Sequence, residues 1–229
     1  MSEVRVATYN IRSGEGIDGR VDIARIARVI GDMDVDIIGL QEVDRNWRRS
    51  QNIYQARYLA KALGMHYVYG PALTRGSAQY GNAVLSRYPI LSSQVHPLAS
   101  YRENRAVLQA VIDVSGHILN FTVTHLGLSL QERLWHIRDI IKPLLITDDP
   151  LVLVGDFNCD PRSPEVLEFE NLLIEAFPKS GYFTFSSDKP DQRIDYIMHN
   201  RLLKTVSVEV IESQASDHLP LAALLAFTG

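Results

Sequence analysis

One short stretch, Leu151–Pro161, restricts the fold more than any other part of the chain. It reads LVLVGDFNCDP, so a run of four apolar residues ends abruptly in Gly-Asp-Phe-Asn. Such a run predicts a buried strand that opens into a loop. Side chains alternate along an extended chain, so we expect Asp156 and Asn158 to face one pocket while Phe157 packs inward. The alternative is that Asp156 only caps a turn, because Asp and Asn are common where strands end.

Polar residues follow or border apolar, strand-like runs at four further places. These are TYNIR after VRVA, QEVD after DIIGL, RIDYI, and SDHLP before the last apolar run. Four unrelated turns are a poor explanation for acid, amide and imidazole groups that recur at strand ends. We therefore expect these residues to share one site.

Length and composition set the frame for this site. The chain has 229 residues, 46% of them apolar, which is enough for one sizeable core, so we expect a single domain over residues 1–229. A net charge of −4 argues against a protein that coats nucleic acid by bulk electrostatics. No stretch resembles a signal peptide or contains 18 uninterrupted apolar residues. We expect a monomeric, cytoplasmic protein without membrane insertion.

Cys159 is the only cysteine of the chain. It therefore cannot form an internal disulfide, which fits a reducing compartment. Its position next to the GDFN segment makes a nucleophile conceivable. We expect a packed thiol instead, because the surrounding acids should raise its pKa.

Hydrophobic periodicity predicts helices interspersed among many strands. Helices are expected over 21–33, from an Asn52 cap to Gly64, from a Ser129/Glu132 capping box through Ile141 to Pro143, and over 163–173. Strands are expected over 4–9, 35–40, 66–70, 80–86, 91–98, 105–114, 117–126, 151–154, 193–199, 205–211 and 220–227. Many of the apolar runs lack the apolar–polar alternation of a sheet that has one face in water. The pattern therefore predicts two packed mixed sheets with helices outside.

The loop Asp44–Ser50 combines three arginines, Arg45, Arg48 and Arg49, with a tryptophan. Solvated loops often have this composition. Arginine beside an aromatic ring is equally a way to bind phosphate and a stacked ring. Because the loop directly follows Glu42, it should leave the sheet at the same edge as the other strand-end residues.

Seven motifs in order and spacing, TYNIR, QEVD, GNAVLSR, THLG, GDFN, RIDYI and SDHLP, resemble the endonuclease/exonuclease/phosphatase superfamily. The resemblance spans nearly the whole chain and implies a four-layer α/β/β/α sandwich of the DNase I type, in agreement with the periodicity. It also implies a metal-dependent hydrolase of phosphoester bonds. Any one of these motifs is weak, and together they say little about the substrate.

The resemblance implies a metal site on one side of the centre. Glu42 would hold Mg²⁺, with Mn²⁺ as a substitute, since a lone carboxylate with amide and water partners suits these hard cations. Asn10 would support that coordination sphere, and Asp217 would border it.

The resemblance also implies catalytic groups. Asp156 would act as base or orient the attacking water, and Asn158 would fix the nucleophile or a phosphate oxygen. His218 would contact the phosphate, held in one tautomer by Asp195. His125 would donate to a phosphate or leaving oxygen, although a histidine on an apolar strand is more often a satisfied core residue.

Two residues have a structural and a functional interpretation of equal weight, and two depart from one branch of the family. Asn82 and Arg105 would either contact substrate or tie loops together. The chain has Arg12 where abasic-site nucleases usually have an acid, and His125 where they usually have tyrosine, which disfavours a repair enzyme.

The expectation is a Mg²⁺-dependent phosphodiesterase or nuclease acting on a phosphodiester, including DNA or RNA. The alternatives are a phosphatase or lipid phosphodiesterase on inositol phosphate or sphingomyelin-type headgroups, and a non-catalytic binding module.

Overall fold

The computed structural model describes residues 2–177 and 181–228 and contains two six-stranded mixed sheets packed face to face. The first sheet has the order β11-β12-β1-β2-β4-β3, with β1 Glu3–Asn10, β2 Ile37–Arg45, β3 His66–Arg75, β4 Ala78–Ser86, β11 Leu203–Val210 and β12 Leu221–Phe227. The second has the order β5-β6-β7-β8-β10-β9, with β5 Ile90–Leu98, β6 Arg105–Val114, β7 His117–His125, β8 Leu151–Asp156, β9 Ile174–Glu175 and β10 Asp195–His199.

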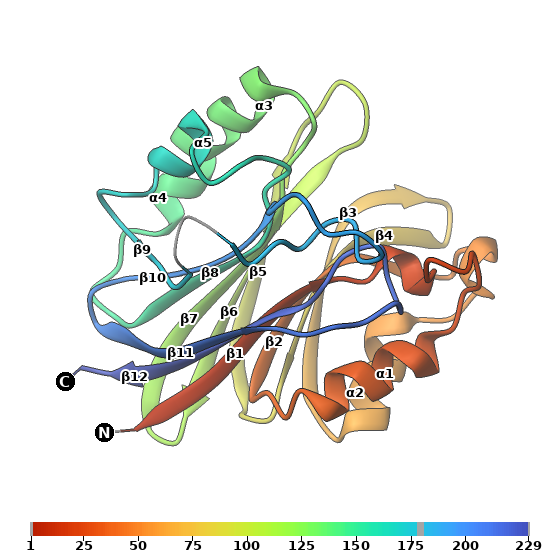
Figure 1. Cartoon of the computed structure of the whole chain (residues 1–229), viewed down its shortest axis with the longest axis horizontal. Helices are drawn as coiled ribbons and strands as arrows, with labels where there is room; N and C mark the ends of the chain where they lie inside the picture. The colour runs from red at the N-terminus through yellow and green to blue at the C-terminus, as the bar shows by residue number, and fades with distance from the viewer. Residues whose placement is uncertain (1, 178–180, 229) are drawn as a thin grey trace.

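Helices cover the outer face of each sheet, which completes four layers (Figure 1). α1 Ile23–Asp32 and α2 Gln55–Leu63 lie on the first sheet, and their apolar faces pack on β1, β2 and β4. The second sheet is covered by α3 Leu130–Trp135, a π-helical turn His136–Ile141, α4 Lys142–Leu144 and α5 Pro164–Leu167. The predicted α/β/β/α sandwich is therefore confirmed. None of the helices in the described ranges is long and apolar enough to cross a membrane.

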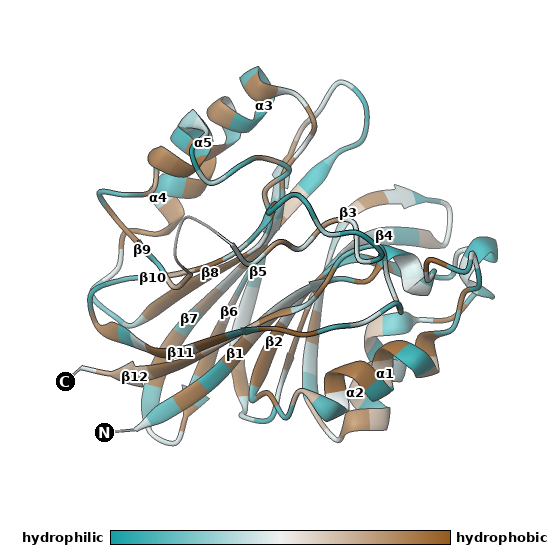
Figure 2. Ribbon diagram, in the orientation of Figure 1, coloured by the Kyte–Doolittle hydropathy of each residue, from teal (hydrophilic) through white to brown (hydrophobic). Residues whose placement is uncertain are grey.

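The central core lies between the sheets, where apolar residues alternate inward from both, and Figure 2 shows the middle strands as largely hydrophobic. The sheets approach closely at Gly39 of β2. A Cβ there would lie 2.5 Å from a methyl group of Val154 and 2.7 Å from one of Val123. Gly39 is thus required by the packing of β2 on β7 and β8.

The alternation that builds this core also places the polar residues. Val6 of β1, Val123 of β7, Val154 of β8 and Ile197 of β10 all face the space between the sheets. Side chains repeat every second residue, so the final inward positions of these strands are Asn10, His125, Asp156 and Asp195. The core therefore ends in polar groups from both sheets at one edge.

The structure differs from the predicted helix boundaries at three places. Tyr54, rather than Asn52, precedes the first turn of α2, while Gly64 ends that helix in the left-handed conformation as predicted. The capping box at α3 is wrong: Ser129 makes no side-chain capping bond, and Glu132 instead accepts hydrogen bonds from the β5–β6 loop. The segment 163–173 forms only the short α5, followed by turns.

Candidate active site

Three adjacent strands of the second sheet bring three polar side chains together at its edge. β7 and β8 are parallel with His125 beside Asp156, and β10 is antiparallel to β8 with Asp195 beside Asp156. His125 Nε2 lies 3.5 Å from Asp156 Oδ2. All three side chains are almost completely buried. The registers of two neighbouring strands thus set an imidazole and a second carboxylate on either side of Asp156.

His218 comes from the first sheet, in the segment between β11 and β12, and crosses to this cluster. Its Nδ1 donates to Asp195 Oδ2 at 2.9 Å, and its Nε2 lies 3.7 Å from Asp156 Oδ2. Ser216 Oγ donates to the backbone carbonyl of Asn10 at 2.7 Å, which fastens the segment to β1. The predicted carboxylate–imidazole pair of Asp195 and His218 is present, with the second ring nitrogen directed at Asp156.

Asn10 connects the two carboxylates predicted for metal binding and catalysis. Its Nδ2 donates to Glu42 Oε1 at 3.2 Å and to Asp156 Oδ2 at 3.0 Å. Its Oδ1 accepts from the backbone N–H of Arg12 at 3.1 Å, which fixes the orientation of the amide. The ends of β1, β2 and β8 therefore meet through one side chain.

Glu42 reaches this position only because β2 is irregular. In regular alternation Gln41 faces the other sheet, where it hydrogen-bonds to Thr8, and residue 42 would face the helices. The pairing of β2 with β4 shifts between Leu40 and Val43, and Glu42 has a φ of 57°, in the left-handed region. This β-bulge turns the Glu42 side chain back towards Asn10. A residue other than glycine in this conformation is strained, as is common at functional sites.

Burial and mutual charge shift the protonation of these groups. Burial raises the pKa of the Asp156 carboxyl, the charge of Asp195 adds to the shift, and His218 opposes it. For His218, burial lowers the pKa, but the charges of Asp195 and Asp156 outweigh that effect and raise it. Burial also lowers the pKa of His125, with the positive charge of Arg105 adding to the effect. The arrangement favours a charged His218 and a neutral His125.

The donor groups at this edge fit a hard divalent cation. Burial raises the pKa of Glu42, and among charged groups Asp217 raises it further, so a cation would stabilise the Glu42 carboxylate. Carboxylate and amide oxygens are the ligands that Mg²⁺ takes in proteins. Asp156, Asp195 and His218 also have ligand atoms within 4.8 Å of one another and form a buried cluster that could hold a metal ion. There, however, the His218 imidazole already bridges the two carboxylates.

Asn158 lies next to the centre by a different route from the one predicted. β8 ends at Asp156, and Asn158 has a φ of 52°, so the chain turns rather than continuing extended. The Asn158 backbone N–H donates to Asp156 Oδ1 at 2.9 Å, and its Nδ2 donates to the carbonyl of Leu126 at 2.9 Å. Phe157 is fully buried, as predicted. The backbone of Asn158 therefore fixes the carboxylate of Asp156. The side-chain nitrogen of Asn158 is bonded to Leu126, and its side-chain oxygen lies on the other side of the amide group.

Asn82 and Arg105 are both buried near the centre, with different partners. Asn82 lies on β4 opposite the bulge, and its Nδ2 donates to the carbonyl of Ala106 on the other sheet at 2.8 Å. Arg105 forms an ion pair with Glu103, and its charge acts on both His125 and Glu42. Asn82 thus ties the sheets together, whereas Arg105 lies within electrostatic reach of His125 and Glu42.

Asp217 and Arg12 meet at the outer side of the site. Arg12 Nε lies 3.4 Å from Asp217 Oδ2. The guanidinium supplies a positive charge beside an acid that the sequence assigns to the border of the metal site. The departure at Arg12 therefore affects the immediate surroundings of the centre.

The thiol of Cys159 is buried in the core of the second sheet and its helices. Burial raises its pKa to about 12, and the charge of Glu165 contributes less. The predicted packed thiol is confirmed, with desolvation rather than nearby acids as the main cause.

Arg45 is the last residue of β2, while Arg48 and Arg49 follow in the loop, and the three arginines have separate environments. Arg49 donates from Nε and Nη2 to the two oxygens of Asp44, both at 2.8 Å, and packs over the rings of Trp47 and Tyr80. Arg45 lies over the ring of Tyr54. The Arg48 side chain is exposed and, within the described residues, forms no hydrogen bond or ion pair.

These environments predict different effects for two neighbouring substitutions. Asp44 is fully buried, so Arg49→Ala should destabilise the protein by about 1–3 kcal/mol, since a buried carboxylate loses its charged partner. Arg48→Ala should leave the melting temperature unchanged. If the loop binds substrate, Arg48→Ala raises KM for a polyanionic substrate and reduces the salt dependence of KM. Thermal melting and KM measured over a salt series test both effects, and an unchanged salt slope would make Arg48 a solvated surface residue.

A match to the Endonuclease/Exonuclease/phosphatase family extends over residues 7–218, so the chain belongs to this family. Its members are hydrolases that act on phosphoester bonds, and the matched range includes every residue of the centre described above. Enzymes of this family generally depend on a divalent metal.

Two individual proteins are similar to this chain in sequence. The chain is 26% identical to YbhP of Escherichia coli K12, an uncharacterised protein, over 96% of this chain and 94% of YbhP. It is 31% identical to protein cwh43 of Schizosaccharomyces pombe over 57% of this chain, a match that spans only 14% of cwh43.

Solved structures show the same fold. An endonuclease/exonuclease/phosphatase from Beutenbergia cavernae superposes with a TM-score of 0.83 at 24% identity, covering 100% of this chain and 72% of that one. The mannosyl-6-phosphatase Bt3783 of Bacteroides thetaiotaomicron superposes with a TM-score of 0.80 at 20% identity, covering 98% of this chain and all of its own.

Proposed function

We propose that this protein is a Mg²⁺-dependent phosphodiesterase that attacks phosphorus in line with water. The observation that carries the proposal is the bridge made by Asn10 between Glu42 and Asp156, opposite the His218–Asp195 pair. This bridge joins Glu42, the proposed cation ligand, to a buried carboxylate at the edge of the sandwich where the His218 imidazole also lies. A binding module would have no need of all these groups together.

The chain's own residues supply a complete set of roles for hydrolysis. Asp156, held by Asn10 and the Asn158 backbone, orients the attacking water and takes up its proton. His218, kept charged by Asp195, contacts a phosphate oxygen and offsets its charge in the transition state. His125 is kept neutral and donates its single N–H to a phosphate or leaving-group oxygen. Asn158 presents its side-chain oxygen to the nucleophile.

Glu42 would hold the metal, with Asn10 and Asp217 completing the protein's part of the sphere. When bound, Mg²⁺ or Mn²⁺ would neutralise charge on phosphate oxygens. Glu42 already has its strained backbone conformation and desolvated carboxyl before a cation binds. Cation binding therefore does not require this residue to be repositioned. The remaining proton chemistry belongs to Asp156 and the two histidines.

A second candidate is hydrolysis of a phosphomonoester on a small molecule or headgroup. The observation in its favour is a bounded pocket of about 470 Å³ next to Arg105, which would accept a small organic group more readily than a duplex. The charge of −4 also provides little general attraction for DNA or RNA.

A panel of substrates with and without metal tests the proposal. Bis-p-nitrophenyl phosphate, plasmid, single-stranded DNA, abasic duplex, sphingomyelin and inositol phosphates would be compared in Mg²⁺, Mn²⁺ and EDTA. We expect metal-dependent release of p-nitrophenol and at least one preferred natural ester. Full activity in excess EDTA would refute the metal assignment, and turnover of monoesters alone would favour the second candidate.

A further inference from the structure

A pocket lies beside the catalytic centre, between two loops of the second sheet. Its volume is about 470 Å³, within the range of sites for small organic ligands. One wall is the β5–β6 loop, and the other is the segment Gly127–Ser129, which begins two residues after His125. Arg105 also lines it, so the pocket opens next to the groups that would act on phosphorus.

The buried end of this pocket contains an unsatisfied donor. Arg105 is only 9% exposed, and its Nε–H has no hydrogen-bond partner among the described residues, while its Nη1 is paired with Glu103. A buried donor without an acceptor costs free energy. An anionic or hydroxyl-bearing group that enters from the centre would satisfy it.

The wall around Arg102 is held rigidly on both sides. Glu132 accepts from Ser100 Oγ and from the Tyr101 backbone N–H, both at 2.8 Å, and this pair of bonds ties the β5–β6 loop to α3. Asn104 Oδ1 accepts from the Ser100 backbone N–H at 3.2 Å. The backbone that carries Arg102 is therefore positioned before a ligand arrives, which reduces the entropy lost on binding.

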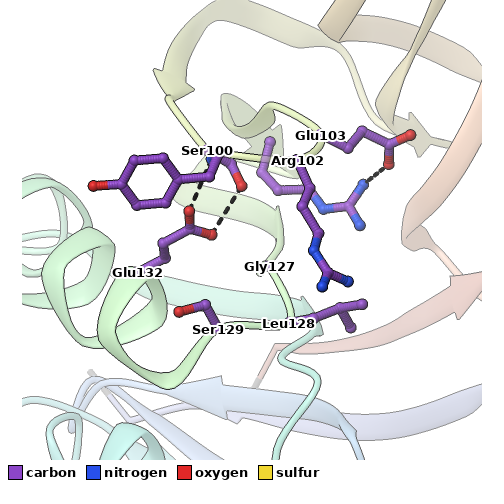
Figure 3. A pocket seen from close by; sticks show the side chains of 9 residues that line it. Ser100, Arg102, Glu103, Gly127, Leu128, Ser129 and Glu132 are labelled. Carbon is purple, nitrogen blue, oxygen red and sulfur yellow. Dashed lines mark hydrogen bonds and ion pairs between the residues drawn. The ribbon is translucent and has the colours of Figure 1, made fainter.

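Arg102 acts on the neighbouring Glu132 carboxyl only through its charge, which is a minor contribution to the lowered pKa of that group. Figure 3 shows the side chain of Arg102 reaching across the pocket towards Leu128. The guanidinium of Arg105, by contrast, is paired with Glu103. Within the described part of the chain, Arg102 makes no hydrogen bond or ion pair. Tyr101 is 98% exposed and Leu128 is 64% exposed, so both offer apolar surface at the rim. A free guanidinium beside two apolar side chains suits a small ring or polyol that carries an anionic group.

We propose that this pocket binds the organic part of the substrate and that Arg102 recognises a second anionic group on it, such as a second phosphate. The preferred substrate is then a small bis-anionic phosphoester, with the reacting phosphate at the Asp156–His218 centre and the second at Arg102. The inference rests on the proposed function for the location of the reacting phosphate. It adds Arg102 as a specificity-determining residue.

Binding measurements on proteins that all carry Asp156→Asn, which suppresses turnover, test this proposal separately from the catalytic one, and in them the wild type means the protein with Arg102 unchanged. Isothermal titration calorimetry in Mg²⁺ would compare glucose 1,6-bisphosphate with glucose 6-phosphate on the wild type, Arg102→Ala and Arg102→Lys. We expect the wild type to bind the bisphosphate at least about tenfold more tightly, since charge-assisted bonds of this kind correspond to roughly 10- to 100-fold in affinity. Arg102→Ala should remove that preference, and Arg102→Lys should retain part of it.

A matched control is Arg57→Ala, an exposed arginine on α2 at the opposite side of the sandwich, which should keep the full preference. Equal affinity of the wild type for the two sugar phosphates, or no binding of the bisphosphate, would overturn the proposal.

Co-sedimentation with vesicles of phosphatidylcholine and phosphatidylglycerol distinguishes a lipid headgroup from a soluble phosphoester as the ligand of this pocket. Vesicle binding lost in Tyr101→Ser and Leu128→Ser, without any preference between the soluble ligands, would instead assign the rim to a membrane surface. Failure of the substrate panel with a retained bisphosphate preference would refute catalysis and leave the binding pocket.

Discussion

The Asp156→Asn variant is expected to lose roughly 10²-fold or more in kcat while KM changes little, and His218→Ala is expected to do the same. Asp156 is fixed by Asn10 and the Asn158 backbone and faces two imidazoles, so its charge is positioned for the transition state. Asparagine keeps the shape but can neither take up a proton nor attract His218. The His218→Ala variant lacks the cation that we propose to contact phosphate.

The two losses should not add. Because the proposed mechanism has Asp156 and His218 act on the same reacting group, the double variant is expected to be about as impaired as the worse single variant. Steady-state kinetics on bis-p-nitrophenyl phosphate would measure this, with circular dichroism to establish that each variant folds. Exposed residues of the same types, in Asp32→Asn and His66→Ala, provide controls that should retain wild-type rates. Near-normal kcat in both single variants would remove these residues from the mechanism.

Replacing Glu42 by glutamine should abolish most metal-dependent turnover, by roughly 10²-fold or more, with the fold intact. The amide preserves size and can still pair with Asn10, but it cannot supply the negative charge that a divalent cation requires. Removing a partly buried charge also relieves its desolvation, so stability should not fall.

A readout independent of activity is the melting temperature in the presence of Mg²⁺. A cation that binds only the folded protein raises the melting temperature, and this rise should be present in the wild type and absent in Glu42→Gln. The control Glu212→Gln, an exposed acid, should behave like the wild type. A rise that persists in Glu42→Gln would place the cation elsewhere, with the Asp156–Asp195–His218 cluster as the next candidate.

Most of the fold and the set of polar residues could be predicted from the sequence because strand alternation is a strict constraint. Asp156 lies two residues from the buried Val154, and Asp195 lies two residues from the buried Ile197, so each acid faces the same side of its strand as the buried residue. This spacing can be read directly from the sequence. The pairing of Asp195 with His218, which is present in the structure, was implied by the family resemblance and not by alternation.

Other features depended on contacts that no local pattern records. The bulge that redirects Glu42 breaks alternation, so the position of this residue followed from family resemblance and not from periodicity. Glu132 matches a capping-box spacing, but the β5–β6 loop provides better donors for its carboxylate. Arg102 was missed because a polar loop carries no periodic signal, and only the meeting of two distant loops forms the pocket.

The centre is divided between the two sheets, and this division makes enzymatic activity a reporter of folding. Asn10, Glu42 and His218 belong to one sheet or its connections, and His125, Asp156 and Asp195 belong to the other. Each sheet alone carries half of the chemistry, so turnover requires the two halves to dock within hydrogen-bonding distance. During refolding, catalytic activity should therefore return after strand structure has formed, at the step in which the two sheets pack against each other.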